Sequence, residues 1–566
     1  MANMKDENGI DPSNQNKVAA AKVLDFDTIL KKEVGHFGWF QVRNIVLAFI
    51  AVIFLGWSNS AYIFTAARIP NRCHIPECDL EDPEFKPSWL LNAVPGASLN
   101  SFDNCQRYSN KSETAIEEGI CPAAWFNQHH LQSCERHLYQ NSDTIVHEFD
   151  MACNEWRRSM VGSIRNCGAV FVQIITGFIS DRWGRRTALV FNVFNAAWIG
   201  ILRSFSNNYM TYVILEFVSC ALGGATFSCS HIILMELVSP NHRAFIGAGL
   251  NTCLSLGVMS LGLIAWSVPY WRHLLRVLHI PQLATISYLW LMSESVRWYI
   301  SKGRYEDTEK ALKTIARVNK KNISDEFLEI LRQKVEEVKI NQEENKVKRE
   351  SRNEPSLIKL LFQYRPVLYR CIITPFLWIV FTLLYHGLKI NAVDISGNKY
   401  VNFIAVTGAQ IPGFWLSLLL LNKIGRKPVL MAFYWLCAAC QILFILVSKK
   451  QYFLSLLVYM VGASCSGGIL SSLYIYTAEL YPTAYRHRLF AFSSMMGRFG
   501  AILAPLTPAL GASMGENVPF ALFAGCACAA GALVLLTPET RGVRLPDTMR
   551  EAADLGKKWR PTTTIS

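Results

Sequence analysis

The stretch DRWGRR, residues 181–186, has a degenerate copy in NKIGRK, residues 422–427. Two more segments recur in the same order: ELVSPNHR (236–243) as ELYPTAYR (479–486), and SESVRW (293–298) as PETRG (538–542). The matching glycines and glutamates of the three pairs lie 241, 243 and 245 residues apart. A nearly constant offset over three ordered motifs indicates an internal duplication, so the chain is predicted to consist of two homologous halves.

The composition is that of a membrane protein. Of the 566 residues, 51% are hydrophobic and only 17% are charged, a balance that soluble proteins of this size rarely have. A helix needs about 20 mostly apolar residues to cross the hydrocarbon core of a bilayer. Twelve such spans are predicted: 45–66, 159–180, 187–205, 211–235, 244–268, 277–296, 369–390, 399–421, 428–448, 452–476, 489–512 and 518–536.

The basic residues of the short loops set the orientation. If the N-terminus lies inside, the Lys- and Arg-rich loops 181–186, 240–243, 422–427 and 484–488 are cytoplasmic. Residues 1–44 lack the apolar core of a signal peptide, so the first span is expected to direct insertion itself. The net charge of +13 is explained by loops beside the anionic membrane lipid, and no nucleic-acid partner is predicted.

The long segment 67–158 is then extracellular. It contains six cysteines that are predicted to form three disulfides, with all 15 pairings left open: Cys73, Cys78, Cys105, Cys121, Cys134 and Cys153. Their irregular spacing argues against a metal site. Asn110 is a glycosylation acceptor, whereas the acceptor at Asn322 falls inside and is expected to stay unmodified. Cys437 and Cys440 are interpreted as packing residues rather than a redox pair.

The composition changes sharply in the central loop. Residues 301–368 mix both charge signs with apolar residues at helical spacing, which predicts short amphipathic helices on the cytoplasmic side. This loop divides the chain into a first six-helix half, 45–300, and a second half, 369–536. Cytoplasmic segments 1–44 and 537–566 flank them. Two such halves around a central path are typical of alternating-access transporters.

GFISDRWGRRTAL (177–189) resembles the loop signature of the major facilitator superfamily, and ELYPTAYR, SESVRW and PETRG narrow the resemblance to its sugar-porter-like branch. With the six-cysteine loop, the central loop and YTAELYPT (476–483), the chain resembles the organic cation, organic anion and carnitine transporter family. The resemblance implies an all-α membrane protein with the major facilitator fold. Twelve transmembrane helices would form two six-helix halves, with a large disulfide-bonded extracellular loop.

The same resemblance implies a secondary carrier for small organic ions. The glycosylatable, disulfide-rich outer loop indicates the plasma membrane, and the basic loops predict that both termini are cytoplasmic. A transceptor that does not transport and a channel are distant alternatives. The sequence has no Gly-rich phosphate loop followed by Lys and Ser or Thr, so direct ATP coupling is not expected. Neither enzymatic activity nor a cofactor is predicted, and the coupling or exchanged ion is left open.

Charged residues at the cytoplasmic helix ends are predicted to act as gates. Asp181 would pair with loop arginines or hold a helix N-terminus, and each motif glutamate would pair with the arginine of its own motif. Such contacts exist only while the cytoplasmic side is closed; the alternative is that these charges only fix topology. Asn422 replaces Asp181 in the second half, so the two gates should differ in strength. The residues are Asp181, Arg185, Arg186, Glu236, Arg243, Glu294, Arg297, Arg426, Glu479 and Arg486.

Arg498 is a permanent charge within the eleventh span. It lies nine residues beyond Leu489, about halfway across a ~30 Å core at a rise of ~1.5 Å per residue. An unpaired arginine facing lipid there costs at least ~2.5 kcal/mol, so Arg498 must face a polar cavity or a partner. In the resembling family this position is Asp in typical cation carriers and Arg in anion and carnitine carriers. Arg498 therefore predicts binding of a carboxylate, and an internal ion pair is the alternative.

Other residues complete the predicted substrate chamber. A basic residue that organic anion carriers often place in the eighth span is absent, because Phe414 occupies the position. With one central positive charge, monoanions or carnitine-like zwitterions are favoured, and organic cations are the alternative. The aromatic candidates are Trp378, Phe381, Tyr385, Phe414, Trp415, Tyr474 and Tyr476, of which one or two are expected to touch substrate, and Gln410 and His386 are polar candidates.

One departure from the superfamily pattern concerns the fourth span, where Glu216 replaces the usual arginine. Glu216 lies 20 residues from Glu236, and Arg165 lies 16 residues from Asp181. Both therefore reach the outer half of the membrane, about 30 Å and 24 Å from the cytoplasmic motifs. The hypothesis is an outer ion pair between the second and fourth spans, against the alternative that both face an aqueous vestibule.

Overall fold

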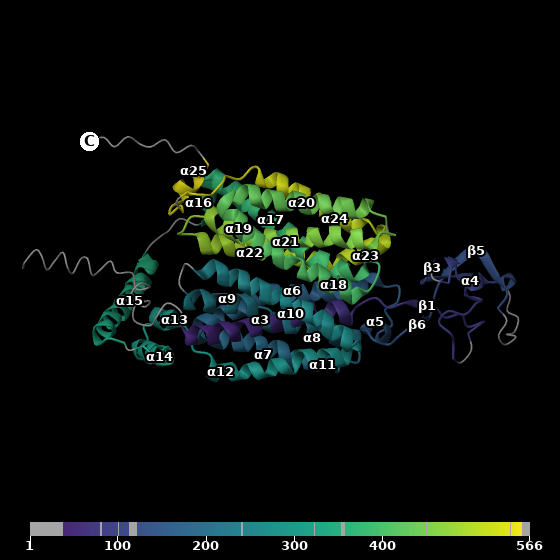
Figure 1. Cartoon of the computed structure of the whole chain (residues 1–566), viewed down its shortest axis with the longest axis horizontal. Coiled ribbons are helices and arrows are strands. Elements are labelled where there is room, and N and C mark those ends of the chain that lie inside the picture. The colour runs from purple at the N-terminus through teal and green to yellow at the C-terminus, as the bar shows by residue number, and fades with distance from the viewer. Residues whose placement is uncertain are drawn as a thin grey trace, which may run out of the picture.

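The computed structural model describes residues 38–79, 82–99, 101–111, 121–238, 242–321, 323–351, 357–448, 450–543 and 545–556. Two bundles of helices lie side by side, one from each half of the chain (Figure 1). A small domain of short strands extends from one end of the bundles, and the central-loop helices lie at the other end. The predicted acceptor Asn322 lies outside the described residues.

Six membrane segments form the first bundle. They are α3 (Trp39–Thr65), α6 (Glu155–Trp183), α7 (Arg185–Arg203), α8 (Tyr209–Gly223) with α9 (Thr226–Leu237), α10 (Arg243–Ser267), and α11 (Trp271–His279) with the 3₁₀ helix η3 (Pro281–Ser287) and α12 (Tyr288–Leu291). The sixth segment begins at Trp271, earlier than the predicted span 277–296, and changes to a 3₁₀ helix at Pro281, which has no N–H to donate to the preceding turn.

The second bundle repeats this plan. Its segments are α17 (Arg365–Asn391) with η4 (Ala392–Asp394), α18 (Lys399–Gly408) with α19 (Gln410–Lys423), α20 (Arg426–Leu446), α21 (Tyr452–Leu480), α22 (Arg486–Leu503) with η5 (Ala504–Leu506) and α23 (Thr507–Met514), and α24 (Val518–Val534). Within the described residues, nine of the twelve segments are long and apolar enough to cross a membrane. The helix α7, the broken sixth segment and the shorter α24 complete the two bundles.

The extracellular domain is built from three antiparallel strand pairs. These are β1 (Asn71–Cys73) with β6 (His137–Tyr139), β2 (Gly96–Ser98) with β3 (Ser101–Phe102), and β4 (Gln106–Asn110) with β5 (Phe126–Ser133); the short helices are α4 (Leu90–Ala93), η1 (Ala123–Trp125) and α5 (Ile145–Glu148). The three predicted disulfides are present as Cys73–Cys134, Cys78–Cys121 and Cys105–Cys153. Two-stranded sheets are marginal alone, so the disulfides hold this domain together.

Helices of the central loop and the C-terminal segment lie at the end of the bundles opposite the strand domain (Figure 1). They are α13 (Val296–Ser301), α14 (Tyr305–Val318), α15 (Asp325–Ser351), α16 (Leu357–Gln363) and α25 (Met549–Asp554). Leu312, Phe327 and Leu331 form the apolar core of the central-loop helices, and Phe40 at the start of α3 packs into the same cluster. The central loop is therefore docked on the first half.

The two halves meet most closely at their outer ends. Ser163 and Asn166 on α6 donate hydrogen bonds of 2.8 Å to the carbonyls of Ile502 and Ala501 near the end of α22. A side chain at Gly162 would meet the ring of Pro505, so this crossing needs a glycine. These contacts close the extracellular side of the path between the halves.

Candidate substrate chamber and gates

Arg498 lies on α22 where that helix packs closely against α17. Gly497 and Gly500 allow the approach, because a side chain at either position would meet the backbone of α17. Thr382 on α17 also donates a hydrogen bond to the Gly497 carbonyl. Arg498 is half-buried, and among the described residues its guanidinium group has no ion pair or hydrogen bond within the protein. The arginine is thus available to a ligand.

Four of the predicted aromatic residues form one cluster beside Arg498. Trp378 on α17 packs edge-on against Tyr474 on α21, with ring centroids 4.8 Å apart, and against Phe490 on α22 at 5.8 Å. Phe381 follows at 5.9 Å from Trp378, and Tyr385 at 5.6 Å from Phe381. Tyr474 is 38% exposed, and the charge of Arg498 acts on it. Arg498 and this cluster therefore share one region.

A second basic side chain, Lys389, lies on the same helix as the aromatic cluster. It is 4% exposed, and its ammonium nitrogen lies 3.6 Å from the centroid of the Tyr385 ring. His386 is within electrostatic reach of both Lys389 and Arg498. Lys389 and Arg498 are thus two positive charges in this part of the second half. Lys389 lies inside the predicted span 369–390 but is not among the residues predicted to line the chamber.

In the first half, Glu216 on α8 is shared by two arginines. Arg165 on α6 lies 3.7 Å from its carboxylate, so the structure brings together the two residues of the hypothesised outer pair. Arg203 at the end of α7 is the nearer partner, and the sequence analysis did not assign it. Arg165 also donates a 2.7 Å hydrogen bond to Asn59 on α3. Because all three charged side chains are at most 4% exposed, they form a buried triad rather than part of an aqueous vestibule.

The end of the first half nearest the central-loop helices is joined through Arg185. Its guanidinium group lies 2.8 Å from Asp181 and 3.6 Å from Glu236, and its backbone N–H donates to Glu294 over 2.8 Å. The N–H of Arg186 donates to the same carboxylate over 3.1 Å. Glu294 thus caps the start of α7, where a carboxylate favours the helix N-terminus.

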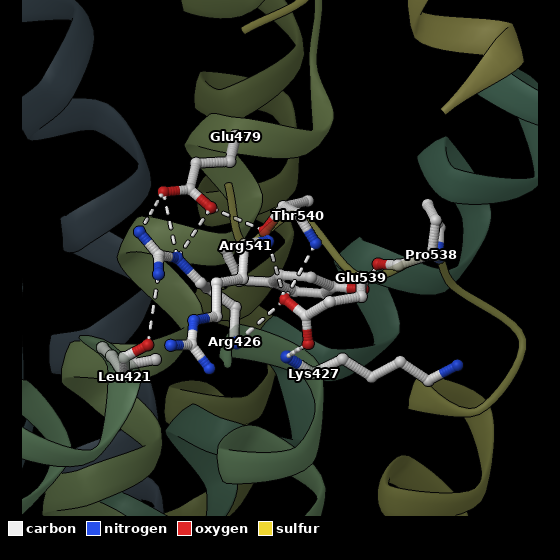
Figure 2. Close-up of polar contacts among 9 residues, drawn as sticks. Leu421, Arg426, Lys427, Glu479, Pro538, Glu539, Thr540 and Arg541 are labelled. Carbon is white, nitrogen blue, oxygen red and sulfur yellow. Dashed lines mark hydrogen bonds and ion pairs between the residues drawn. The ribbon is translucent and has the colours of Figure 1, made fainter. Parts of the chain in front are cut away.

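The second half has the same arrangement around Arg426, as Figure 2 shows. Its guanidinium group lies 3.1 Å from Glu479, which also accepts a 2.6 Å hydrogen bond from Thr540. Glu539 accepts 3.0 Å hydrogen bonds from the N–H groups of Arg426 and Lys427. Each network joins helix ends within one half of the protein.

The glycines of the repeated loops are required by this geometry. Gly184 and Gly425 have φ values of 105° and 125°, a region that disfavours side chains. A side chain at either glycine would also meet Glu294 or Glu539, respectively. The duplicated glycine therefore lets each capping carboxylate approach its loop.

The motif glutamates bond residues of these loops instead of their predicted partners Arg243 and Arg486. Glu236 contacts Arg185 and Glu479 contacts Arg426, while Arg486 donates to the Tyr481 carbonyl over 3.3 Å. The sequence repeat located the correct motifs but not the pairing between them.

Comparisons with known proteins agree with this architecture. The family model for sugar (and other) transporters matches residues 92–551. The chain belongs to this family. Solute carrier family 22 member 6 of Rattus norvegicus is 27% identical over 542 residues, covering 92% of this chain and 93% of that protein. The organic cation transporter protein of Drosophila melanogaster is 26% identical over 547 residues, covering 96% and 97%.

Solved structures place the chain in the same fold class. The inward-open structure of the xylose transporter XylE from E. coli has a TM-score of 0.58 at 13% identity, with 92% of this chain and 100% of that chain covered. The predicted major facilitator fold and the resemblance to the organic ion transporters are confirmed. This member of the sugar (and other) transporter family is a multi-pass secondary transporter and not an enzyme.

Several predicted chamber residues of this transporter pack inside the second half. Gln410 donates a 3.3 Å hydrogen bond to Ser466 on α21, and Phe414 is buried against Gly467 of the same helix. Tyr476 donates to Thr537 over 2.7 Å. These side chains hold helices together and are buried. Tyr474, which is 38% exposed, is a better candidate for a substrate contact.

The transporter's capping carboxylate Glu294 lies outside the membrane segments. Burial raises the pKa of Glu294 above its ordinary value of 4.5, against hydrogen bonds from the N–H groups of Ser295, Arg186 and Arg185, which lower it. The hydrogen bonds by which Glu294 caps α7 therefore offset only part of the free-energy cost of removing this carboxylate from water.

Proposed function

We propose that this transporter is a plasma-membrane carrier for small organic anions that works by alternating access. The single observation that carries the proposal is Arg498, a permanent cation on α22 without a protein partner in the described chain. A guanidinium group at this depth is stable only beside an anion or water. Its planar donors suit a carboxylate, which can accept two parallel hydrogen bonds.

The substrate class follows from the groups around Arg498. Tyr474, which is 38% exposed, offers an aromatic ring for an apolar or flat substrate body, and Trp378 and Phe381 pack behind it at 3% and 4% exposed. Lys389 adds a second positive charge to the region. Carboxylates with an aromatic or aliphatic body therefore fit better than carnitine-like zwitterions, whose ammonium group would meet like charge.

The networks around Arg185 and Arg426 are proposed to hold the inner gate helices of each half in place. Each network fixes the helix ends of one half as a unit, which suits the rigid-body motion of two halves about a central site. Asn110, at the end of β4 in the extracellular domain, is proposed as the glycosylation site.

The test is uptake into cells of a monocarboxylate such as benzoate, a carnitine-like zwitterion and tetraethylammonium. Native chain, Arg498→Ala and Arg498→Lys are compared at equal surface expression. Arg488→Ala is the matched control, because Arg488 lies on the same helix but is exposed at its cytoplasmic end. We expect benzoate to enter the native and Arg488→Ala cells, with a loss of at least tenfold in Arg498→Ala. Benzoate uptake that does not depend on Arg498 would contradict the proposal.

An organic cation carrier is the second candidate. Tyr474, which packs edge-on against Trp378 and is 38% exposed, is an aromatic ring of the kind that binds ammonium groups. The relative in Drosophila melanogaster is named an organic cation transporter protein. Entry of tetraethylammonium into native and Arg498→Ala cells at equal rates would favour this candidate.

A further inference from the structure

The side chain of Lys389 occupies the face of the Tyr385 ring. Its ammonium nitrogen is 3.6 Å from the ring centroid, and both side chains are almost fully buried, at 4% and 6% exposed. A cation over an aromatic face is how proteins bind organic ammonium ligands. Here the cation belongs to the chain itself.

Helix geometry explains why these two residues meet. Lys389 follows Tyr385 by four residues on α17, and side chains at this spacing lie on one face of a helix. Long helical side chains also lean toward the N-terminus, so the lysine folds back over the tyrosine ring. Phe381, one turn earlier, packs against Tyr385 with ring centroids 5.6 Å apart and fixes the ring.

No carboxylate among the described residues forms an ion pair with Lys389. The charges that act on the intervening His386 include those of Lys389, Arg498 and Arg165, which are all positive. The tyrosine ring is therefore the group that holds this ammonium in place. A lysine that served only to neutralise a buried acid would have a carboxylate within ion-pair distance.

We propose that Lys389 is a specificity-determining residue that fills the ammonium site on Tyr385 and so excludes organic cations from the chamber. The inference rests on the proposed anion transport. It adds that cation rejection has a structural cause at one position on α17, separate from the anion anchor Arg498 on α22. Removing the lysine head group has two effects. It frees the face of the Tyr385 ring, and it removes the positive charge that would repel an incoming ammonium group.

The experiment measures binding of tetraethylammonium and benzoate to the purified full-length protein by isothermal titration calorimetry. The variants are Lys389→Met, which keeps the length and apolar stem, and Lys389→Arg, which keeps the charge. Lys399→Met is the matched control, because Lys399 also lies over a ring, that of Tyr400 at 5.1 Å, but outside the chamber at the start of α18. Lys389→Met/Tyr385→Leu removes the ring as well.

We expect Lys389→Met to bind tetraethylammonium on the order of tenfold more tightly than the native protein, the size of one cation–π contact. Lys389→Arg and Lys399→Met should behave like the native protein, and Lys389→Met/Tyr385→Leu should lose the gain. If Lys389→Met does not fold, Lys389→Gln is measured in its place.

Equal tetraethylammonium affinity in the native protein and Lys389→Met would overturn the inference. So would a gain that survives loss of the ring, because charge repulsion alone would then explain it. The benzoate measurement separates the two proposals when Arg498→Ala is measured beside the native protein. Equal benzoate affinity in both would contradict the proposed role of Arg498 in anion transport. The tetraethylammonium comparison still decides whether Lys389 fills a cation site.

Discussion

The substitution Glu216→Gln tests the buried triad of the first half. It removes the one carboxylate that Arg165 and Arg203 share in the described part of the chain. Glutamine keeps the volume and the ability to hydrogen-bond, so the change is mainly one of charge. Two arginines then face each other in the protein interior without compensation.

The expected cost follows from the burial of the three side chains. Arg203 and Glu216 are 1% and 0% exposed, so water does not screen the charges that remain. Removing one partner of such a pair costs about 3–5 kcal/mol. At roughly 2 °C per kcal/mol for a unit the size of one half, Tm should fall by about 6–10 °C.

The assay is thermal unfolding of the detergent-solubilised protein, followed with a thiol-reactive dye. Cys220 is buried on α8, one turn beyond Glu216, so it reports opening of this helix. The control is Glu216→Gln/Arg203→Met, which removes both nearest partners together. Replacing a buried pair by groups of similar size is often nearly neutral, so this double variant should regain most of the lost Tm.

The reasoning is refuted if Glu216→Gln lowers Tm by less than about 2 °C, or if the double variant is no more stable than the single one. The triad also changes what a charge swap should do. Exchanging Arg165→Glu with Glu216→Arg places the new arginine beside Arg203, so the swap should not recover transport. Recovery by the swap would mean that Arg203 is not part of the network.

Two further predictions concern the outer end of the protein. A disulfide introduced by Ser163→Cys with Ile502→Cys, which now share a 2.8 Å hydrogen bond, should lock the outer side shut and stop uptake until a reductant is added; unchanged uptake after crosslinking would exclude an outer gate here. Glu148 on α5 has its pKa lowered below 4.5, because hydrogen bonds from Arg272 and Trp271 and the charge of Arg272 outweigh the opposing effect of burial. Its stabilising effect should be present above pH 4.5 and be lost as pH falls through the lowered pKa, so the Tm difference between native chain and Glu148→Gln should vanish in acid; a difference that persists there would exclude an ionic contribution.

The fold was predictable because its signals are long and repeated. Each apolar span extends over about 20 residues, and the motif at Gly184 returns at Gly425 with the same backbone conformation. The sixth span was placed too late because Arg272 and Arg276 interrupt the apolar residues at the start of α11. Apolar patterning does not extend a helix into a charged stretch, although the backbone continues there as a helix.

The charged residues were harder to place than the helices. Arg203 was not assigned because it lies at the end of its predicted span, where an arginine normally reaches water. Only the tertiary packing of α7 against α8 turns it toward Glu216. Lys389 likewise stands two residues before the end of α17, and only its contact with the Tyr385 ring shows that its charge is buried. In both cases contacts between helices, which no local pattern contains, decide whether a terminal charge is solvated or buried.

The two halves of the transporter have diverged in charge in a way that suits an anion carrier. In the first half, Arg165 and Arg203 share the carboxylate of Glu216, so their positive charge is partly neutralised inside the protein. In the second half, neither Lys389 nor Arg498 has a carboxylate partner among the described residues. On the proposed anion transport, an entering anion would meet uncompensated charge on α17 and α22, whereas the arginines of α6 and α7 are paired with α8. Substitutions on α17 and α22 should accordingly alter which charge is accepted, whereas substitutions in the triad should alter stability first.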